Sequence, residues 1–202
     1  MAGPHDDFLE MAHPHGWVRV ADNLLEHAIE LRRLSTGHVT RTFPAAKRKT
    51  WPASNRSVFL LAGFALENAL KAFLVYENPG WVSNGSLSWR LKSHDLTELH
   101  AKAKSVPHKL RSGPVLKAFQ AGLMSWARYP CALKEADSFD EEVLTEKLWH
   151  SYLKLMAAYG RRLNALLARE WKGPNGFRSR MVSTGRIELD FLPRARSPRR
   201  IL

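Results

Sequence analysis

Apolar residues recur along much of this chain at alternating spacings of four and three, which is the period of an amphipathic α-helix. The clearest stripe is formed by Trp17, Ala21, Leu24, Ala28 and Leu31. Strand-like alternation is confined to one short piece, residues 186–192. The pattern therefore predicts an all-α bundle of about five helices, at residues 17–34, 58–76, from 93–96 onward, from 114 to about 127, and at 140–171.

The helix at residues 58–76 is apolar around most of its circumference, so we expect it to be buried on most sides. Glu67, Asn68 and Lys71 interrupt it, and Glu67 precedes Lys71 by four residues, the favourable order for an ion pair. Two explanations stay open: a pair at the solvent edge of the helix, or a polar cluster that faces a cleft. Because lipid would not tolerate these charges, we expect no membrane-spanning helix.

Two long connections carry residues of interest. Residues 36–56 are rich in basic side chains and interrupted by prolines, which predicts an irregular linker. Within it, Lys47, Arg48 and Lys49 form a candidate nucleic-acid-binding patch. Residues 77–93 predict a turn-rich loop, in which Trp81 and Trp89 either cover the core, as is commoner, or stack on a nucleobase.

Neither end of the chain shows a helical pattern. Residues 1–16 are rich in His, Pro and Gly and predict a flexible lead, whose histidines do not indicate a metal site. Residues 172–202 predict a basic, mostly irregular tail. The expected organisation is therefore a lead at 1–16, a helical domain at 17–171 and a tail at 172–202.

The net charge of +12 points to an anionic partner. Residues 171–202 hold eight basic and two acidic side chains, so half of the excess lies in this segment. An arginine-rich end suits phosphate backbones, although a solvated tail without a partner is the alternative. The candidate nucleic-acid-binding residues of the tail are Arg178, Arg180, Arg194, Arg196, Arg199 and Arg200.

The remaining composition narrows the classes of function. A single cysteine, Cys131, excludes an internal disulfide and fits a reducing compartment. Acidic residues near the N-terminus are unlike a secretory signal, so we expect a cytoplasmic protein. Phosphate-binding loops, dinucleotide fingerprints and the common metal and hydrolase motifs do not occur, so we expect no cofactor and no metal.

Two further polar residues lie at helix ends. His94 precedes the short third helix and is either a structural helix-start residue or a general acid or base. Arg128 lies where the fourth helix ends before Pro130, with its guanidinium close to backbone carbonyls or aimed at an external phosphate.

Residues 62–72, which read AGFALENALKA, resemble the second helix of bacterial HEPN (higher eukaryote and prokaryote nucleotide-binding) domains. In that family a long loop follows, then a His-Asp-Leu helix start, here residues 94–96. A later helix ends in Arg-Tyr-Pro, here residues 128–130. The order and spacing of all three motifs match, and the resemblance covers roughly residues 17–170.

The resemblance implies a helical bundle, often dimeric, with roles centred on RNA in stress, toxin–antitoxin or phage-defence systems. Catalytic members are metal-independent ribonucleases, similar in an Arg-x4–6-His motif near the start of the final helix. Here the spacing occurs only for His38, with Arg32 or Arg33, at the end of the first helix. His150 lies near the start of the final helix without such an arginine.

Two hypotheses follow. The first is a HEPN-like RNA-associated homodimer that binds RNA and, ranked lower, cleaves it. On this hypothesis a basic groove formed across the dimer holds the RNA, and a noncanonical set such as Glu67, Lys71, His94 and Arg128 acts on a 2′-hydroxyl and the adjacent phosphate. The second is a non-catalytic helical adaptor or nucleotide-binding module that dimerises and recruits a protein partner through its tail. Basicity favours the first hypothesis, and the missing Arg–His motif favours the second.

Overall fold

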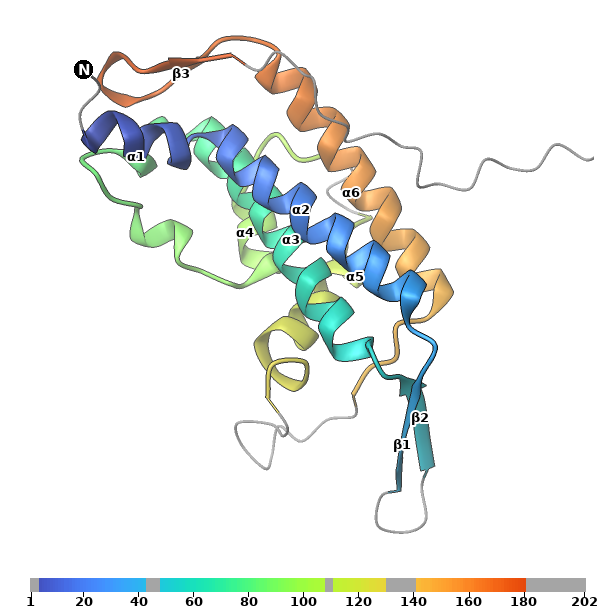
Figure 1. Ribbon diagram of the computed structural model, residues 1–202. Helices are drawn as coiled ribbons and strands as arrows, with labels where there is room; N and C mark the ends of the chain where they lie inside the picture. The colour runs from blue at the N-terminus through green and yellow to red at the C-terminus, as the bar shows by residue number, and fades with distance from the viewer. Residues whose placement is uncertain (1–3, 43–47, 108–110, 130–140, 181–202) are drawn as a thin grey trace, which may run out of the picture.

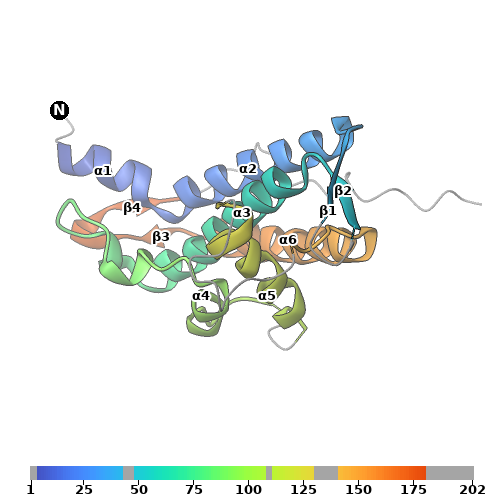
Figure 2. The same cartoon turned by 90° about the horizontal axis from the view of Figure 1, so that it is seen from below.

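Helix α3 (Asn55–Glu77) lies at the centre of the structure, with the other helices packed around it (Figure 1). Fifteen of its 23 residues are buried, and they cover its whole circumference. Helices α2 (Pro14–Leu34) and α6 (Glu146–Leu167) run beside it. Helices α4 (Leu96–Lys102) and α5 (Gly113–Ala121) lie on the side of α3 opposite to α2 (Figure 2). The expectation of a largely buried helix at residues 58–76 is confirmed.

The computed structural model describes residues 4–42, 48–107, 111–129 and 141–180. Within these residues the fold is mostly α-helical, with two small antiparallel sheets. The elements not yet named are α1 (Pro4–Ala12), β1 (His38–Thr42), β2 (Arg48–Pro52), the 3₁₀ turns η2 (Pro79–Val82), η3 (Trp89–Leu91) and η6 (Pro174–Gly176), the π-helical turn η4 (Gly122–Trp126), β3 (Trp171–Lys172) and β4 (Arg178–Ser179). The strand-like piece expected at residues 186–192 lies outside the described residues.

Contacts between aromatic rings pack α5, η4 and α6 against the first half of α3. The ring centroids of Phe59 and Trp126 are 4.7 Å apart, those of Phe59 and Phe119 4.9 Å, and those of Phe119 and Tyr152 4.6 Å. Tyr152 is fully buried, and its hydroxyl donates a hydrogen bond of 3.0 Å to the carbonyl of Ala62. Such edge and tilted ring contacts add to the hydrophobic gain of burial.

Close approach at this junction depends on Gly122. A Cβ added there would lie 3.1 Å from Phe59 Cδ1 and 3.2 Å from Trp126 Cζ2, tighter than ordinary packing. Gly63, the glycine of α3, faces the same junction. A Cβ on Gly63 would meet Leu123 at an ordinary 3.5 Å, so the constraint lies on the opposite side of the contact.

The N-terminal segment is a helix followed by a sharp corner, and not the irregular lead expected for residues 1–16. In the described part of it, α1 precedes α2, and Leu9 of α1 is 1% exposed. His13 caps α2, because its Nδ1 accepts a hydrogen bond from the backbone N–H of His15. Desolvation lowers the pKa of both histidines, that of His15 to about 4.

Residues 177 and 179, far away in the sequence, pack over this junction of α1 and α2. The ring centroids of His13 and Phe177 are 6.0 Å apart, and Ser179 Oγ lies 3.4 Å from His15 Nδ1. Phe177 and Ser179 belong to the β3–β4 hairpin. No local pattern in residues 1–16 reveals this partner, which is why the sequence predicts a flexible lead.

The start of α6 also differs from the expectation of residue 140. The helix begins at Glu146, and Thr145 caps it by accepting the backbone N–H of Leu148 at 3.2 Å. Residues 141–145 form no regular element, and Asn55 of α3 hydrogen-bonds to their backbone: its Oδ1 accepts from the N–H of Leu144 at 3.0 Å. Asn55 Nδ2 donates to the carbonyl of Glu142 at 2.9 Å.

By length and hydropathy α3 passes as a membrane-spanning helix, but 78% of its most apolar window is buried inside the bundle. A buried core helix of a globular protein has the same composition, so this feature is accounted for by packing.

Asp22 of α2 lies over a small hollow lined by residues of α2, α3 and α6, among them Ala69, Met156 and Leu163. Burial, helped by the neighbouring charge of Glu26, raises the pKa of Asp22 to about 6. The unfolded chain releases this proton near pH 4. The contribution of this group to the free energy of unfolding is therefore fully present below pH 4 and is lost as the pH rises to about 6.

We expect Asp22→Asn to raise the free energy of unfolding by about 1–2 kcal/mol at pH 7.5 and to leave it nearly unchanged at pH 4. Denaturant titration at the two pH values measures this. Asp7→Asn, at an exposed carboxylate of α1, is the matched control and should change stability by less than about 0.5 kcal/mol at either pH. An equal effect of Asp22→Asn at both pH values would contradict a buried, protonated Asp22.

Candidate functional site

Glu67, Lys71 and His94, three of the four predicted catalytic residues, meet beside α3. Lys71 Nζ lies 2.6 Å from Glu67 Oε1, and His94 Nδ1 lies 2.9 Å from Glu67 Oε2. A single carboxylate therefore joins both basic groups. We call these three residues the Glu67 cluster.

The Glu67–Lys71 pair is buried, so the solvent-edge explanation of this pair is wrong. The side chain of Glu67 is 5% exposed and that of Lys71 is 6% exposed, whereas the His94 side chain is 45% exposed. Lys71 Nζ also lies 5.7 Å from the ring centroid of Trp17, a cation–π arrangement. Buried charges are tolerated when paired in this way, and only His94 connects the cluster with the surface.

The start of α4 holds His94 in place. Asp95 caps this helix, because its carboxylate accepts the backbone N–H of Glu98 at 2.8 Å and the hydroxyl of Thr97 at 2.7 Å. Although partial burial acts in the opposite direction, these hydrogen bonds lower the pKa of Asp95. Ser93 Oγ accepts the backbone N–H of Asp95 and donates to Glu98, so the turn around His94 is fixed from both sides.

Arg128 is not a member of the Glu67 cluster. Its guanidinium carbon lies 5.8 Å from the ring centroid of Phe64, one helical turn before Glu67 on α3. Within the described residues Arg128 makes no hydrogen bond or ion pair with the cluster. It is exposed after η4, on the same side of α3 as Glu67 and Lys71.

The geometry limits what the cluster can do chemically. His94 Nδ1 is engaged with the carboxylate, so Nε2 is the ring nitrogen left to exchange protons with a ligand or with water. Glu67 and Lys71 neutralise each other behind it and are shielded from the surface. They are suited to orienting His94, as a carboxylate orients an imidazole in hydrolytic enzymes, and not to contacting a ligand themselves.

A basic hairpin replaces the irregular linker expected at residues 36–56. Strands β1 and β2 pair antiparallel, with Arg41 opposite Lys49 and Thr42 opposite Arg48. Because side chains alternate along a strand, Arg41 and Lys49 share one face and Arg48 lies on the other. Thr residues at 40 and 50 form a side-chain hydrogen bond across the ladder, which is a sheet-specific contact that the sequence pattern does not reveal.

The hairpin extends away from the helices, as Figure 1 shows at the lower edge of the bundle. Its base is anchored by Trp51, which is 6% exposed. Arg48 is exposed and Lys49 half-buried. Lys47, the third residue of the predicted patch, lies outside the described residues.

Of the six predicted basic residues near the C-terminal end, two lie within the described residues. Arg178 is exposed and pairs with Glu170 at 3.0 Å, and Arg180 Nε donates to the carbonyl of Ala168 at 3.1 Å. Both therefore also stabilise the segment after α6. The other four predicted residues, Arg194, Arg196, Arg199 and Arg200, lie outside the described residues.

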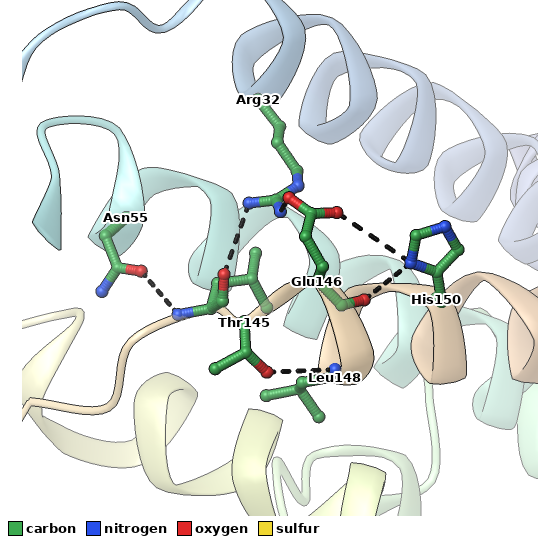
Figure 3. A network of polar contacts seen from close by, with 7 residues as sticks. Arg32, Asn55, Thr145, Glu146, Leu148 and His150 are labelled. Atoms are coloured by element: carbon green, nitrogen blue, oxygen red, sulfur yellow. Dashed lines mark hydrogen bonds and ion pairs between the residues drawn. The ribbon is translucent and has the colours of Figure 1, made fainter.

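A second polar set, which sequence reasoning missed, lies at the start of α6 (Figure 3). Arg32 of α2 pairs with Glu146 at 2.5 Å, and its guanidinium carbon lies 5.3 Å from the ring centroid of Trp149. His150 Nδ1 lies 2.7 Å from the carbonyl oxygen of Glu146 and 3.9 Å from its carboxylate. No spacing in the sequence links Arg32 with His150, because α2 and α6 come from opposite ends of the chain.

In the part of the chain that the structure describes, no group of three or more His, Cys, Asp or Glu side chains is arranged to hold a metal ion. Comparisons with protein-family models, with curated protein sequences and with solved structures find no match to this chain. Function is therefore argued from its residues and their geometry.

Breaking the buried Glu67–Lys71 pair should lower the stability of the folded protein. We expect Lys71→Met to lower the free energy of unfolding by about 3–5 kcal/mol, because it leaves the Glu67 carboxylate buried without the cation that it is paired with. Adding Glu67→Gln to the same chain should recover part of that loss. A double-mutant cycle by denaturant unfolding measures the coupling.

The exposed pair Glu98–Lys102 is a matched control, because it has the same spacing of four residues and a similar separation of 2.5 Å. Its side chains are 45% and 36% exposed, so solvent screens it and the same substitutions there should have a much smaller effect. Equal losses of stability at the two pairs would show that burial does not govern the Glu67 cluster.

Proposed function

We propose that this protein is HEPN-like and binds RNA, acting as a cytoplasmic homodimer in a stress, toxin–antitoxin or phage-defence response. The observation that carries RNA binding is the β1–β2 hairpin. It extends beyond the helical bundle and carries Arg41, Arg48 and Lys49 on its two faces (Figure 1). With a net charge of +12 on the whole chain, these residues favour contact with a phosphate backbone.

The relation to HEPN domains is supported by how the three motifs are arranged. Residues 62–72 lie on the central helix, and His94 from the second motif is bonded to Glu67 of the first. Arg128 from the third motif lies over Phe64, also of the first. Segments far apart in the sequence thus meet along one side of α3, as parts of a shared site would.

RNA cleavage ranks below RNA binding in this proposal. In the Glu67 cluster His94 alone is substantially exposed, and Arg128 is separate from it. General acid–base cleavage needs two proton-transfer groups at the 2′-hydroxyl and the leaving oxygen. The cluster offers one such group at the surface.

A protein-binding adaptor is the second candidate function. An apolar hollow of about 270 Å³ lies between α1, α2 and the loop at Leu87. Its lining includes Met11, Val20 and Leu87, which are 68%, 46% and 37% exposed. Exposed apolar surface of this kind favours contact with another protein. The tail proposed to recruit such a partner lies largely outside the described residues.

RNA binding is tested with the full chain, purified after nuclease treatment and a high-salt wash. We expect a labelled RNA to be retained at low salt and released progressively as the salt concentration rises. Arg41→Gln, Arg48→Gln and Lys49→Gln combined should weaken binding. The salt slope should fall by about 0.7 for each phosphate that the variant no longer neutralises.

A control variant also removes three positive charges, but from α6, through Lys147→Gln, Lys154→Gln and Arg161→Gln. It should leave affinity closer to that of the unmodified chain. Deletion of residues 181–202, which spares the β3–β4 hairpin, measures how much of the RNA affinity comes from the tail. Absence of retention at low salt would rule out RNA binding, and equally weakened binding in both triple variants would remove the hairpin from the interface.

Cleavage is tested separately, by incubating labelled RNA with the protein in the presence of EDTA. We expect the RNA to stay intact, since the exposed part of the Glu67 cluster holds one proton-transfer group. EDTA-resistant cleavage that disappears in His94→Ala but persists in His150→Ala would contradict this expectation and place a reaction at the Glu67 cluster.

A further inference from the structure

We propose that Trp81, Arg90 and Trp89 form a nucleobase-stacking site. The guanidinium carbon of Arg90 lies 5.6 Å from the ring centroid of Trp81 and 5.2 Å from that of Trp89. Trp89 is 69% exposed, the most exposed of the large apolar side chains in the described residues. The commoner expectation that these tryptophans cover the core is therefore wrong for Trp89.

The loop that carries this site is already ordered by its own contacts. Val82 and Leu91 are buried at 0% and 2% exposure and anchor it at both ends. The backbone N–H of Ser88 donates to the carbonyl of Trp81 at 2.7 Å, and Ser88 Oγ caps the turn that contains Arg90. A ligand that stacks on Trp89 therefore meets a largely preformed surface, which limits the entropy lost on binding.

A basic hollow of about 500 Å³ opens beside Arg90. It is lined by Trp81, Arg90, Lys102 and Lys104 together with polar groups at the end of α3. The acidic side chain in its wall is Glu77, whose carboxylate accepts the backbone N–H groups of residues 104 and 105 at 2.9 and 2.5 Å. Lys102 is paired with Glu98 at 2.5 Å, so Arg90 and Lys104 supply the positive charge that makes the hollow suited to a phosphate.

An exposed indole ring next to a cationic hollow is suited to one kind of ligand. The indole can stack on an unpaired nucleobase while the hollow binds the phosphate that follows this base. Stacking on aromatic side chains is sequence-tolerant, because every base has a π-face. Bases inside a duplex do not present that face. The site therefore selects single-stranded over double-stranded nucleic acid, and this inference rests on the proposed RNA binding.

Trp89 supplies its own spectroscopic readout. Unstructured oligouridylate is titrated into the full chain while tryptophan fluorescence and affinity are followed together. We expect quenching in the unmodified protein and weaker quenching in Trp89→Phe, which leaves Trp81 in the site. This variant keeps an aromatic ring at position 89 and should bind nearly as tightly. Trp89→Ala should weaken binding by about 5- to 100-fold, the range for one stacked base. Its salt slope should be unchanged, because no phosphate contact is removed.

Met124→Ala is the matched control, since Met124 is an exposed apolar residue of η4, outside the stack and outside the hollow at Leu87. It should bind as the unmodified chain does. If the unmodified chain binds RNA but Trp89→Ala binds equally well, the stacking site is overturned while RNA binding stands. A duplex of the same length that competes as well as the single strand also overturns it. If the unmodified chain binds no RNA at low salt, the proposed function itself fails.

Discussion

Helix α3 is buried around its whole circumference, and this requirement constrains the rest of the chain. Four other helices meet it from different directions, and the rings of Phe59, Phe119 and Tyr152 fill the junction near its first half. Burial of such rings contributes about 1.5–3 kcal/mol each relative to exposure.

The same enclosure explains the Glu67 cluster. Residues 67 and 71 lie on the part of α3 that α2 covers at Trp17, so their charges are removed from water together. A pair in this position adds little net stability but makes alternative packings costly, since any shift of α2 or of the α4 start leaves a charge unpaired. The cluster thus ties the position of His94 to the packing of the core.

Much of the fold could be predicted from the sequence because its signals are local. Periodicity identified α2 and α3, and the His-Asp-Leu motif at residues 94–96 marked the start of α4. The errors arose where a distant segment decides the outcome. Asn55 delays the start of α6, and Phe177 covers the corner at His13. The hairpin at residues 38–52 escaped notice because its strands are exposed and lack an apolar alternation.

The candidate site could likewise be predicted only where its signals are local in the sequence. The spacing of Glu67 and Lys71 indicated a pair, and the HEPN resemblance added His94. The burial of the Glu67–Lys71 pair depends on how other elements cover α3, and the position of Arg128 depends on η4. The Arg32–Glu146–His150 set depends on how α2 and α6 approach each other. The exposure of Trp89 depends on a loop whose anchors, Val82 and Leu91, carry no recognisable pattern.

The corner at His13 and His15 has a consequence for the order of synthesis. Its cover, Phe177 and Ser179, is made late, and Figure 1 shows β3 lying beside α1 at that end of the molecule. Until residues 177–179 are synthesised, His13 and His15 lack these contacts. A chain truncated before residue 177 therefore leaves the junction of α1 and α2 without its cover, and incompletely packed surface of this kind favours aggregation.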